Sequence, residues 1–283
     1  MNIVVFAFIN LICLEILLYM NQFKKYILIL VVVLSTLCSC TNESVDQIPV
    51  SMLKKIVETS VDGSSTVTTL NYNGNKIVNI DKTDAFLEFY YTGDLITKTV
   101  ETTKSSSRKN TLEYSYSEGK LTKITSSENY FINYIHNNDG SISYEKLTKD
   151  SDNKILKIYH GVLFFQNGNL IKEDQILDNT GSEILIRNVN DLKYDNKKNP
   201  LNNILGFDKL YNYSYLISLN NATISVYRTT IKKINDDQII SSINRIDSQY
   251  QYNSNGYPTE VISEKIIFGG SDSKHIKSQL FYN

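Results

Sequence analysis

A short phrase recurs along the chain and limits what it can fold into. Apolar and polar residues alternate, a glycine or asparagine follows, and another apolar residue comes next. In residues 111–124, Tyr114 and Tyr116 alternate with polar residues before Gly119, and Leu121 follows the glycine. Period-two alternation is typical of a half-buried strand, and glycine supplies the positive φ of a tight hairpin turn. Each copy therefore predicts a β-hairpin, with turn residues at positions 74, 93, 119, 140, 168, 199 and 256.

The number of copies predicts an all-β fold of about 14 to 18 strands. Open twisted sheets seldom exceed about 10 strands without curling, and alternating strands need their apolar face covered. We therefore expect residues 53–283 to form an antiparallel meander of repeated hairpins that curls into an incomplete barrel or a two-layer roll. The phrase is interrupted between 205 and 247, where Asn220-Asn221 is the one comparable turn signal. Residues 206–219 predict one short helix that plugs an open end.

Two copies of the phrase carry a resemblance to a known repeat. Tyr194-Asp-Asn-Lys-Lys-Asn-Pro-Leu201 and Tyr252-Asn-Ser-Asn-Gly-Tyr-Pro258 resemble the tyrosine–aspartate repeat of the Rhs (YD) type. The chain is also similar to Bacteroidetes-type outer-membrane lipoproteins of unknown function, in which this repeat is degenerate. The resemblance covers roughly residues 66–265 and implies a repeat-built scaffold, with no catalytic residues attached to it. Many copies lack the aspartate, and the chain is too short for a closed Rhs shell.

The N-terminal segment predicts export and lipid attachment. Lys24 and Lys25 precede the apolar run 26–34, which is shorter than the roughly 20 residues of a membrane-spanning helix. The four residues that end at Cys40 resemble the bacterial lipobox, which implies cleavage before Cys40 and lipid on its thiol. Residues 1–39 are therefore predicted to be a lipoprotein signal peptide.

The start of this segment and the region after it have separate interpretations. Met20 would open a signal of ordinary length, so it is the predicted true start, with a paired-helix anchor as the alternative for the first nineteen residues. Residues 40–52 lack apolar periodicity and predict a flexible tether. Cys13 and Cys38 fall before the predicted cleavage, so Cys40 is the one cysteine of the mature chain and its sulfur carries lipid.

Charge narrows the predicted partners. The whole chain has 29 basic and 30 acidic residues, without a strong block of either sign, so we expect no nucleic-acid partner. The membrane is the expected partner through the N-terminal lipid, and an extracellular polymer or protein is a possible ligand. The early acidic residues Glu43 and Asp46 resemble the surface-export signals of Bacteroidetes-type lipoproteins, and this resemblance implies an outer-membrane location that faces the cell exterior.

No arrangement of residues predicts a catalytic site, a metal site or a cofactor. His136, His160 and His275 lie in separate units, without the spacing of a metal-binding helix. The acidic stretches 150–153 and 235–237 resemble calcium loops in composition, but they lack the terminal glutamate and are more typical of hairpin turns.

Tyrosine, present 20 times, is the abundant aromatic residue. Most tyrosines occupy fixed repeat positions, which favours a structural ladder of cross-strand pairs. Tyr211, Tyr213 and Tyr215 fall outside this register and are the candidate binding surface.

Three functions remain open on this evidence. The first is a lipid-anchored, non-enzymatic cell-envelope module that binds a ligand or acts as a scaffold. The second is a periplasm-facing chaperone or assembly factor that holds an acyl chain or an unfolded strand. The third is a surface hydrolase.

Overall fold

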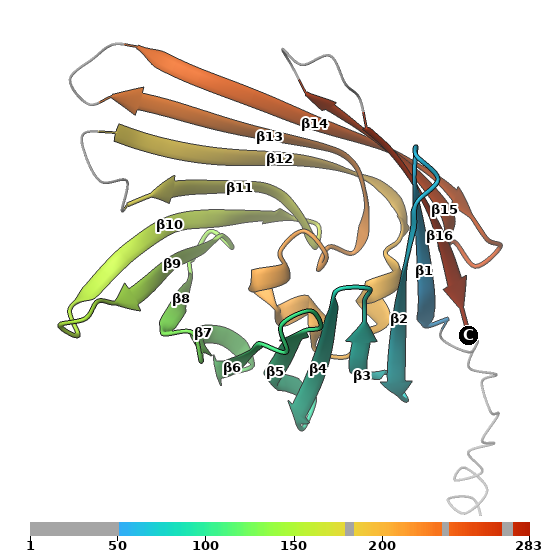
Figure 1. The fold of residues 1–283 in the computed structure, drawn as a ribbon, viewed down its shortest axis with the longest axis horizontal. Coiled ribbons are helices and arrows are strands. Elements are labelled where there is room, and N and C mark those ends of the chain that lie inside the picture. Colours follow the sequence, from blue (N-terminus) through green and yellow to red (C-terminus); the bar gives the residue numbers. More distant parts are fainter. Residues whose placement is uncertain (1–50, 179–183, 234–237, 268–273) are drawn as a thin grey trace, which may run out of the picture. The chain divides into compact units, whose positions relative to one another are not determined.

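The computed structural model describes residues 51–178, 184–233, 238–267 and 274–283, and these form one closed antiparallel β-barrel. Each strand pairs with its neighbours in sequence, and β1 pairs with β16 to close the wall (Figure 1). The strands are β1 Leu53–Ser60, β2 Ser65–Asn73, β3 Lys76–Asp81, β4 Ala85–Thr92, β5 Leu95–Thr103, β6 Lys109–Ser117, β7 Lys120–Ser126, β8 Tyr130–His136, β9 Ile142–Lys149, β10 Ile155–Gln166, β11 Asn169–Leu177, β12 Ile184–Lys198, β13 Asn220–Lys233, β14 Ile239–Tyr252, β15 Pro258–Ile267 and β16 Lys274–Tyr282.

The sixteen strands agree with the all-β meander predicted from the repeats, but the incomplete barrel or two-layer roll is wrong because the sheet closes. Register shifts recur next to the glycine turns of five hairpins, for example between Ser115 and Tyr116 in β6–β7 and between Tyr90 and Tyr91 in β4–β5. A bulge adds local twist and bends its strand. Repeated bulges of this kind supply the curvature that brings β1 to β16.

Six of the seven predicted turn residues lie in hairpin turns, and all six turns lie at the same end of the barrel. They are Gly74, Gly93, Gly119, Gly140, Gly168 and Gly256. Glu118 and Gly119 both have positive φ, at 51° and 72°, as a two-residue type I′ turn requires. The seventh position, Asn199, instead caps a 3₁₀ helix, accepting from the backbone N–H of Leu201. Asn220 and Asn221, expected at a turn, begin β13.

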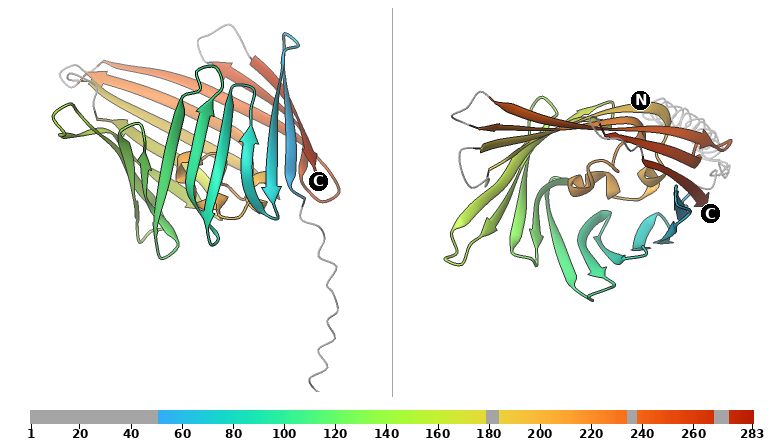
Figure 2. Two further views of the ribbon diagram at one scale, coloured as in Figure 1. Left: turned by 60° about the horizontal axis from the view of Figure 1, so that its bottom comes forward. Right: turned by 45° about the horizontal axis from the view of Figure 1, so that its top comes forward.

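The connection between β12 and β13, residues 199–219, lies inside the barrel at the end that carries the glycine turns (Figures 1 and 2). We call it the plug. It contains three short 3₁₀ helices, η1 Pro200–Asn203, η2 Phe207–Lys209 and η3 Tyr211–Tyr213, rather than the single helix expected over 206–219. No helix in the described part of the chain has the length and hydropathy needed to cross a membrane.

The core lies where the plug meets the inner wall. Phe207 and Leu210 of the plug are 2% and 0% exposed and pack with inward-facing wall residues. Four of those wall residues directly or nearly follow glycine turns, and each has no exposed surface: Ile77, Ile96, Leu121 and Leu170. The apolar residue of the repeated phrase therefore fills the barrel at its turn end, which we call the plugged end. The opposite end is the mouth.

The outer wall carries charged side chains beside exposed apolar ones, such as Tyr90, Ile135 and Ile262. Residues that face outward form ion pairs between adjacent strands. Examples are Lys157 Nζ with Glu145 Oε2 at 2.9 Å and Lys277 Nζ with Glu260 Oε2 at 2.8 Å. Arg187 Nε donates to Asp174 Oδ1 at 2.7 Å between β12 and β11. These pairs lie within the strands, so the charged side chains are part of the wall itself.

Candidate functional site

The tyrosines of the repeat tie each unit to its neighbour through backbone carbonyl groups. The expected ladder of paired rings is replaced by hydroxyl groups that donate to carbonyl oxygens around the plugged end. These bonds are Tyr72 to Leu53 at 2.7 Å, Tyr116 to Ile96 at 2.7 Å, Tyr194 to Leu170 at 2.6 Å, Tyr250 to Ala222 at 2.8 Å and Tyr282 to Pro258 at 2.7 Å. Tyr91 reaches the plug instead, donating to the carbonyl of Leu205 at 3.1 Å. We call these six residues the tyrosine ring.

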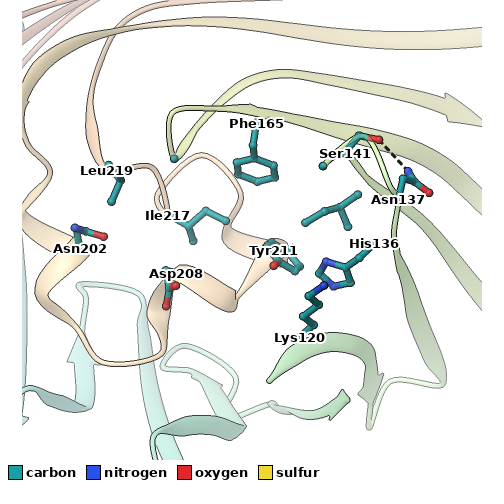
Figure 3. A pocket seen from close by; sticks show the side chains of 13 residues that line it. Lys120, His136, Asn137, Ser141, Phe165, Asn202, Asp208, Tyr211, Ile217 and Leu219 are labelled. Carbon is teal, nitrogen blue, oxygen red and sulfur yellow. Dashed lines mark hydrogen bonds between the residues drawn. The ribbon is translucent and has the colours of Figure 1, made fainter. Parts of the chain in front are cut away.

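Two neighbouring repeats have no tyrosine at this position, and a cavity lies there. His136 takes the position in β8 and bonds the Leu121 carbonyl through Nε2 at 2.9 Å, while Phe165 takes it in β10. The lower cavity, of about 450 Å³, lies between these two residues and Tyr211 and Ile217 of the plug (Figure 3). Lys120, Asn202 and Asp208 also line it. Its turn residues Gly140 and Gly168 place it at the plugged end.

A second, smaller cavity lies nearer the mouth, on the other side of Tyr211. This upper cavity has a volume of about 110 Å³. It is lined by strands β8 to β11 and by η3 and the residue after it, with Ile132, Tyr134, Tyr144, Tyr159, Glu173, Gln175, Tyr211, Asn212 and Ser214. Four aromatic rings and one carboxylate therefore line this small cavity.

The aromatic rings of the upper cavity pack edge to face or tilted against one another. The ring centroids of Tyr134 and Tyr211 lie 5.5 Å apart, and those of Tyr144 and Tyr159 lie 6.0 Å apart with an interplanar angle of 79°. Such contacts hold rings in fixed orientations. Burial raises the pKa of Tyr159 and of Tyr211 to about 12, so both hydroxyls are protonated at neutral pH.

Glu173 is held by a chain of hydrogen bonds. The Tyr144 hydroxyl donates to Glu173 Oε1 at 2.7 Å, Gln175 Nε2 donates to the Tyr144 hydroxyl at 3.3 Å, and Asn188 Nδ2 donates to Gln175 Oε1 at 3.2 Å. Burial, followed by the charge of Glu173, raises the pKa of Tyr144 well above its usual value. The carboxylate is thus fixed in place with Tyr144 as a neutral donor.

Gly161 makes room for Tyr144. A Cβ on Gly161 would lie 2.7 Å from Cζ of Tyr144 and 2.6 Å from the backbone oxygen of Asp174. Gly161 of β10 and Tyr144 of β9 are register partners. The Tyr144 ring therefore crosses the glycine and reaches Glu173 on β11. A glycine in a strand interior signals such a close approach, although sequence reasoning did not use it.

The three predicted binding tyrosines are separated in the structure. Tyr211 lines both cavities, and Tyr213 is stacked against Phe207 with a centroid distance of 6.0 Å. Tyr215 is 60% exposed. The structure brings only Tyr211 to a cavity, and joins it there to Glu173 and to tyrosines that the repeat pattern had treated as structural.

The predicted lipidation site, Cys40, lies outside the described residues, as do the signal segment and most of the tether. The histidines lie apart: His160 Nδ1 contacts Asp178 Oδ2 at 2.8 Å, and His275 contacts Glu264 at 3.6 Å. Asp150 accepts from backbone groups of its own hairpin turn, and residues 235–237 are outside the described ranges. The described residues contain no group of three potential metal ligands.

The geometry defines a closed, sixteen-stranded barrel with an internal plug. No protein-family model matches the sequence, and no curated protein is a significant match. Solved structures do share the fold. A porin-like protein from Bacteroides vulgatus ATCC 8482 has a TM-score of 0.52 and 15% identity, over 82% of this chain and 99% of that one. A porin-like protein from Bacteroides uniformis ATCC 8492 has a TM-score of 0.50 and 12% identity, over 82% and 96%. At these identities the likeness shows the fold alone.

Proposed function

We propose that this protein is a lipid-anchored, non-enzymatic binding module of the outer membrane, with a barrel that stands in water and takes its ligand through the mouth. The observation that carries the proposal is the charged outer wall. Glu145 and Lys157 on the outer face are 34% and 43% exposed, and Arg187, Asp174 and Lys172 form a further charged group. A lysine or arginine facing lipid at the bilayer midplane costs about 2–4 kcal/mol.

The filled plugged end argues against a water channel through the barrel. The fully buried Leu210 of the plug packs against the wall at this end, and Tyr91 bonds the plug backbone directly. The porin-like neighbours support a barrel architecture, while the plug favours a one-ended cup.

The position of the chain entry supports an outward-facing mouth. The Ser51 carbonyl accepts from Asn203 Nδ2 of η1 at 3.0 Å, so the tether joins the barrel at the plugged end. If lipid on Cys40 holds that tether, the plugged end faces the membrane and the mouth faces away from it. A ligand from the aqueous side then meets the polar inner wall first.

Replacing Cys40 tests this proposal. Wild-type protein should incorporate a palmitate analogue and fractionate with membranes, whereas Cys40→Ala should lose the label. Cys38→Ala is the control, because it leaves Cys40 and a small residue before it in place, and it should behave as wild type. Wild-type protein that takes up no palmitate analogue and still resists alkaline carbonate extraction would overturn the proposal. Protease treatment of intact cells then reports whether the domain faces the exterior.

A further inference from the structure

The upper cavity has the chemistry of a site for a positively charged amine. We propose that it binds a primary ammonium group, supplied by a free alkylamine or by a lysine side chain, between the rings of Tyr134, Tyr144, Tyr159 and Tyr211 and the carboxylate of Glu173. This inference rests on the proposed function as a binding module and names the ligand class of that module.

Two acceptor-bearing groups belong to residues that line the cavity, the Glu173 carboxylate and the Asn212 side-chain oxygen. The Tyr144 hydroxyl already donates to Glu173 Oε1, and Gln175 already donates to Tyr144. Asn212 Oδ1 is buried and accepts no hydrogen bond from the described residues, while its Nδ2 donates to the Tyr114 hydroxyl at 3.3 Å. An unpaired buried acceptor is costly, so a donor-rich ligand is favoured. An ammonium group carries three N–H donors and no acceptor.

The negative charge of Glu173 and the aromatic rings of the cavity also favour a cation. Aromatic faces attract ammonium groups through their quadrupole, and a carboxylate beside them adds a charge-assisted hydrogen bond. The negative charge of Glu173 acts on Tyr134, Tyr144 and Tyr159, which places the carboxylate among the rings. Asp208 contributes further negative charge near Tyr211.

The inner wall already places an ammonium group beside the cavity, near one of its four rings. Lys146 Nζ, from β9, lies 3.8 Å from the ring centroid of Tyr130 and 5.8 Å from that of Tyr159. Its register partner in β10 is Tyr159, so the lysine faces the interior next to the cavity. A ligand cation would be repelled by this charge, and removal of the charge should therefore strengthen binding.

The size of the cavity limits what enters it. Pockets that enclose drug-sized ligands measure about 300–1,000 Å³, whereas the upper cavity measures about 110 Å³. It therefore holds a terminal group rather than a polymer segment. Quaternary ammonium groups lack N–H donors and would leave Asn212 Oδ1 unpaired, which favours a primary amine.

Calorimetry on the full chain purified in detergent tests the proposal. The probes are n-butylammonium, Nα-acetyl-lysine methylamide, tetramethylammonium and methyl β-glucoside. We expect saturable binding of the two primary amines, with weaker binding of tetramethylammonium and none of the glucoside. Equal affinity for the two primary amines indicates a free-amine ligand, and tighter binding of the lysine compound indicates a peptide side chain.

Glu173→Gln keeps the shape and the hydrogen bond from Tyr144 but removes the charge, so amine affinity should fall about tenfold or more. Glu145→Gln, on the outer face of β9, is the matched control and should bind as wild type. Lys146→Met should bind the amines about threefold more tightly, and this variant remains informative if Glu173→Gln unfolds. Absence of amine binding, equal binding by Glu173→Gln, or weaker binding by Lys146→Met would overturn the inference.

The outcomes also separate this inference from the proposed function. Lipid labelling at Cys40 together with absent amine binding removes the ligand assignment alone. Amine binding by a chain that is not labelled at Cys40 removes the anchor proposal alone.

Discussion

At the scale of single residues, the hydroxyl groups of the tyrosine ring stabilise the barrel by joining adjacent strands that belong to neighbouring hairpins. Tyr116 belongs to the hairpin β6–β7, and its acceptor, Ile96, begins the second strand of the preceding hairpin. The hydroxyl group therefore has to reach a carbonyl group on the adjacent strand. This explains why tyrosine, rather than phenylalanine, recurs at most of these positions of the phrase.

Removing the hydroxyl group of one residue of the tyrosine ring should lower the stability of the fold measurably. Tyr116→Phe deletes the donor to the Ile96 carbonyl, and we expect the free energy of unfolding to fall by about 1 kcal/mol. Urea denaturation followed by circular dichroism measures the change. Tyr215→Phe is the control, because Tyr215 is 60% exposed, and it should unfold as wild type. Equal midpoints for the two variants would show that the ring bonds add no net stability.

At the scale of elements, the sequence predicted the hairpins well, because alternation and glycine turns are local signals. It did not predict closure, which depends on bulges such as the one between Ser115 and Tyr116 and on pairing between the two most distant strands. Nor did it predict the form of the plug. Short 3₁₀ helices carry no long-range periodicity, and Asn199 has the same turn chemistry as a hairpin.

The candidate site was predictable only in part. Tyr211 was singled out because it breaks the repeat register, and it lines both cavities. Glu173 and Tyr144 were missed because they alternate like any other inward-facing residue of their strands. Their contact depends on Gly161, which leaves space for the Tyr144 ring, and on the register between β9 and β10. The cavity also needs η3, which comes from a distant segment of the chain. Such juxtapositions are tertiary and leave no spacing in the sequence.

The plug is fitted to the wall at Gly206, which has φ 72°. A Cβ there would lie 2.7 Å from the backbone oxygen of Asp94 in the β4–β5 turn, whereas a Cβ on Gly119, also at φ 72°, has open space. Gly119→Ala should cost about 1–2 kcal/mol from conformational strain alone. Gly206→Ala should cost about 1–3 kcal/mol more, because the plug must shift from the wall. Thermal unfolding of the two variants measures the added cost of the contact at Gly206. Equal losses of stability in the two variants would contradict a close fit between the plug and the wall.

At the scale of the whole molecule, burial of so many tyrosines links stability to alkaline pH. Burial raises the pKa of Tyr114, Tyr159 and Tyr250 to about 12, against about 10 in an unfolded chain. Between these values the folded state keeps protons that the unfolded state has lost. Stability is therefore fully present below pH 10 and decreases as pH rises from about 10 to 12, by at most about 1.4 kcal/mol per pH unit for each such tyrosine.

Alkaline titration of the full chain in detergent checks this expectation. The chain has no tryptophan, so ultraviolet absorbance reports tyrosinate cleanly. We expect a minority of exposed tyrosines to ionise near pH 10 and the remainder to ionise together with loss of the β-sheet circular dichroism signal. The two signals should coincide because the buried hydroxyls lose protons readily only when the barrel opens. Complete ionisation near pH 10 with an intact β signal would mean that water reaches the tyrosine ring, and the plugged end would then not be sealed.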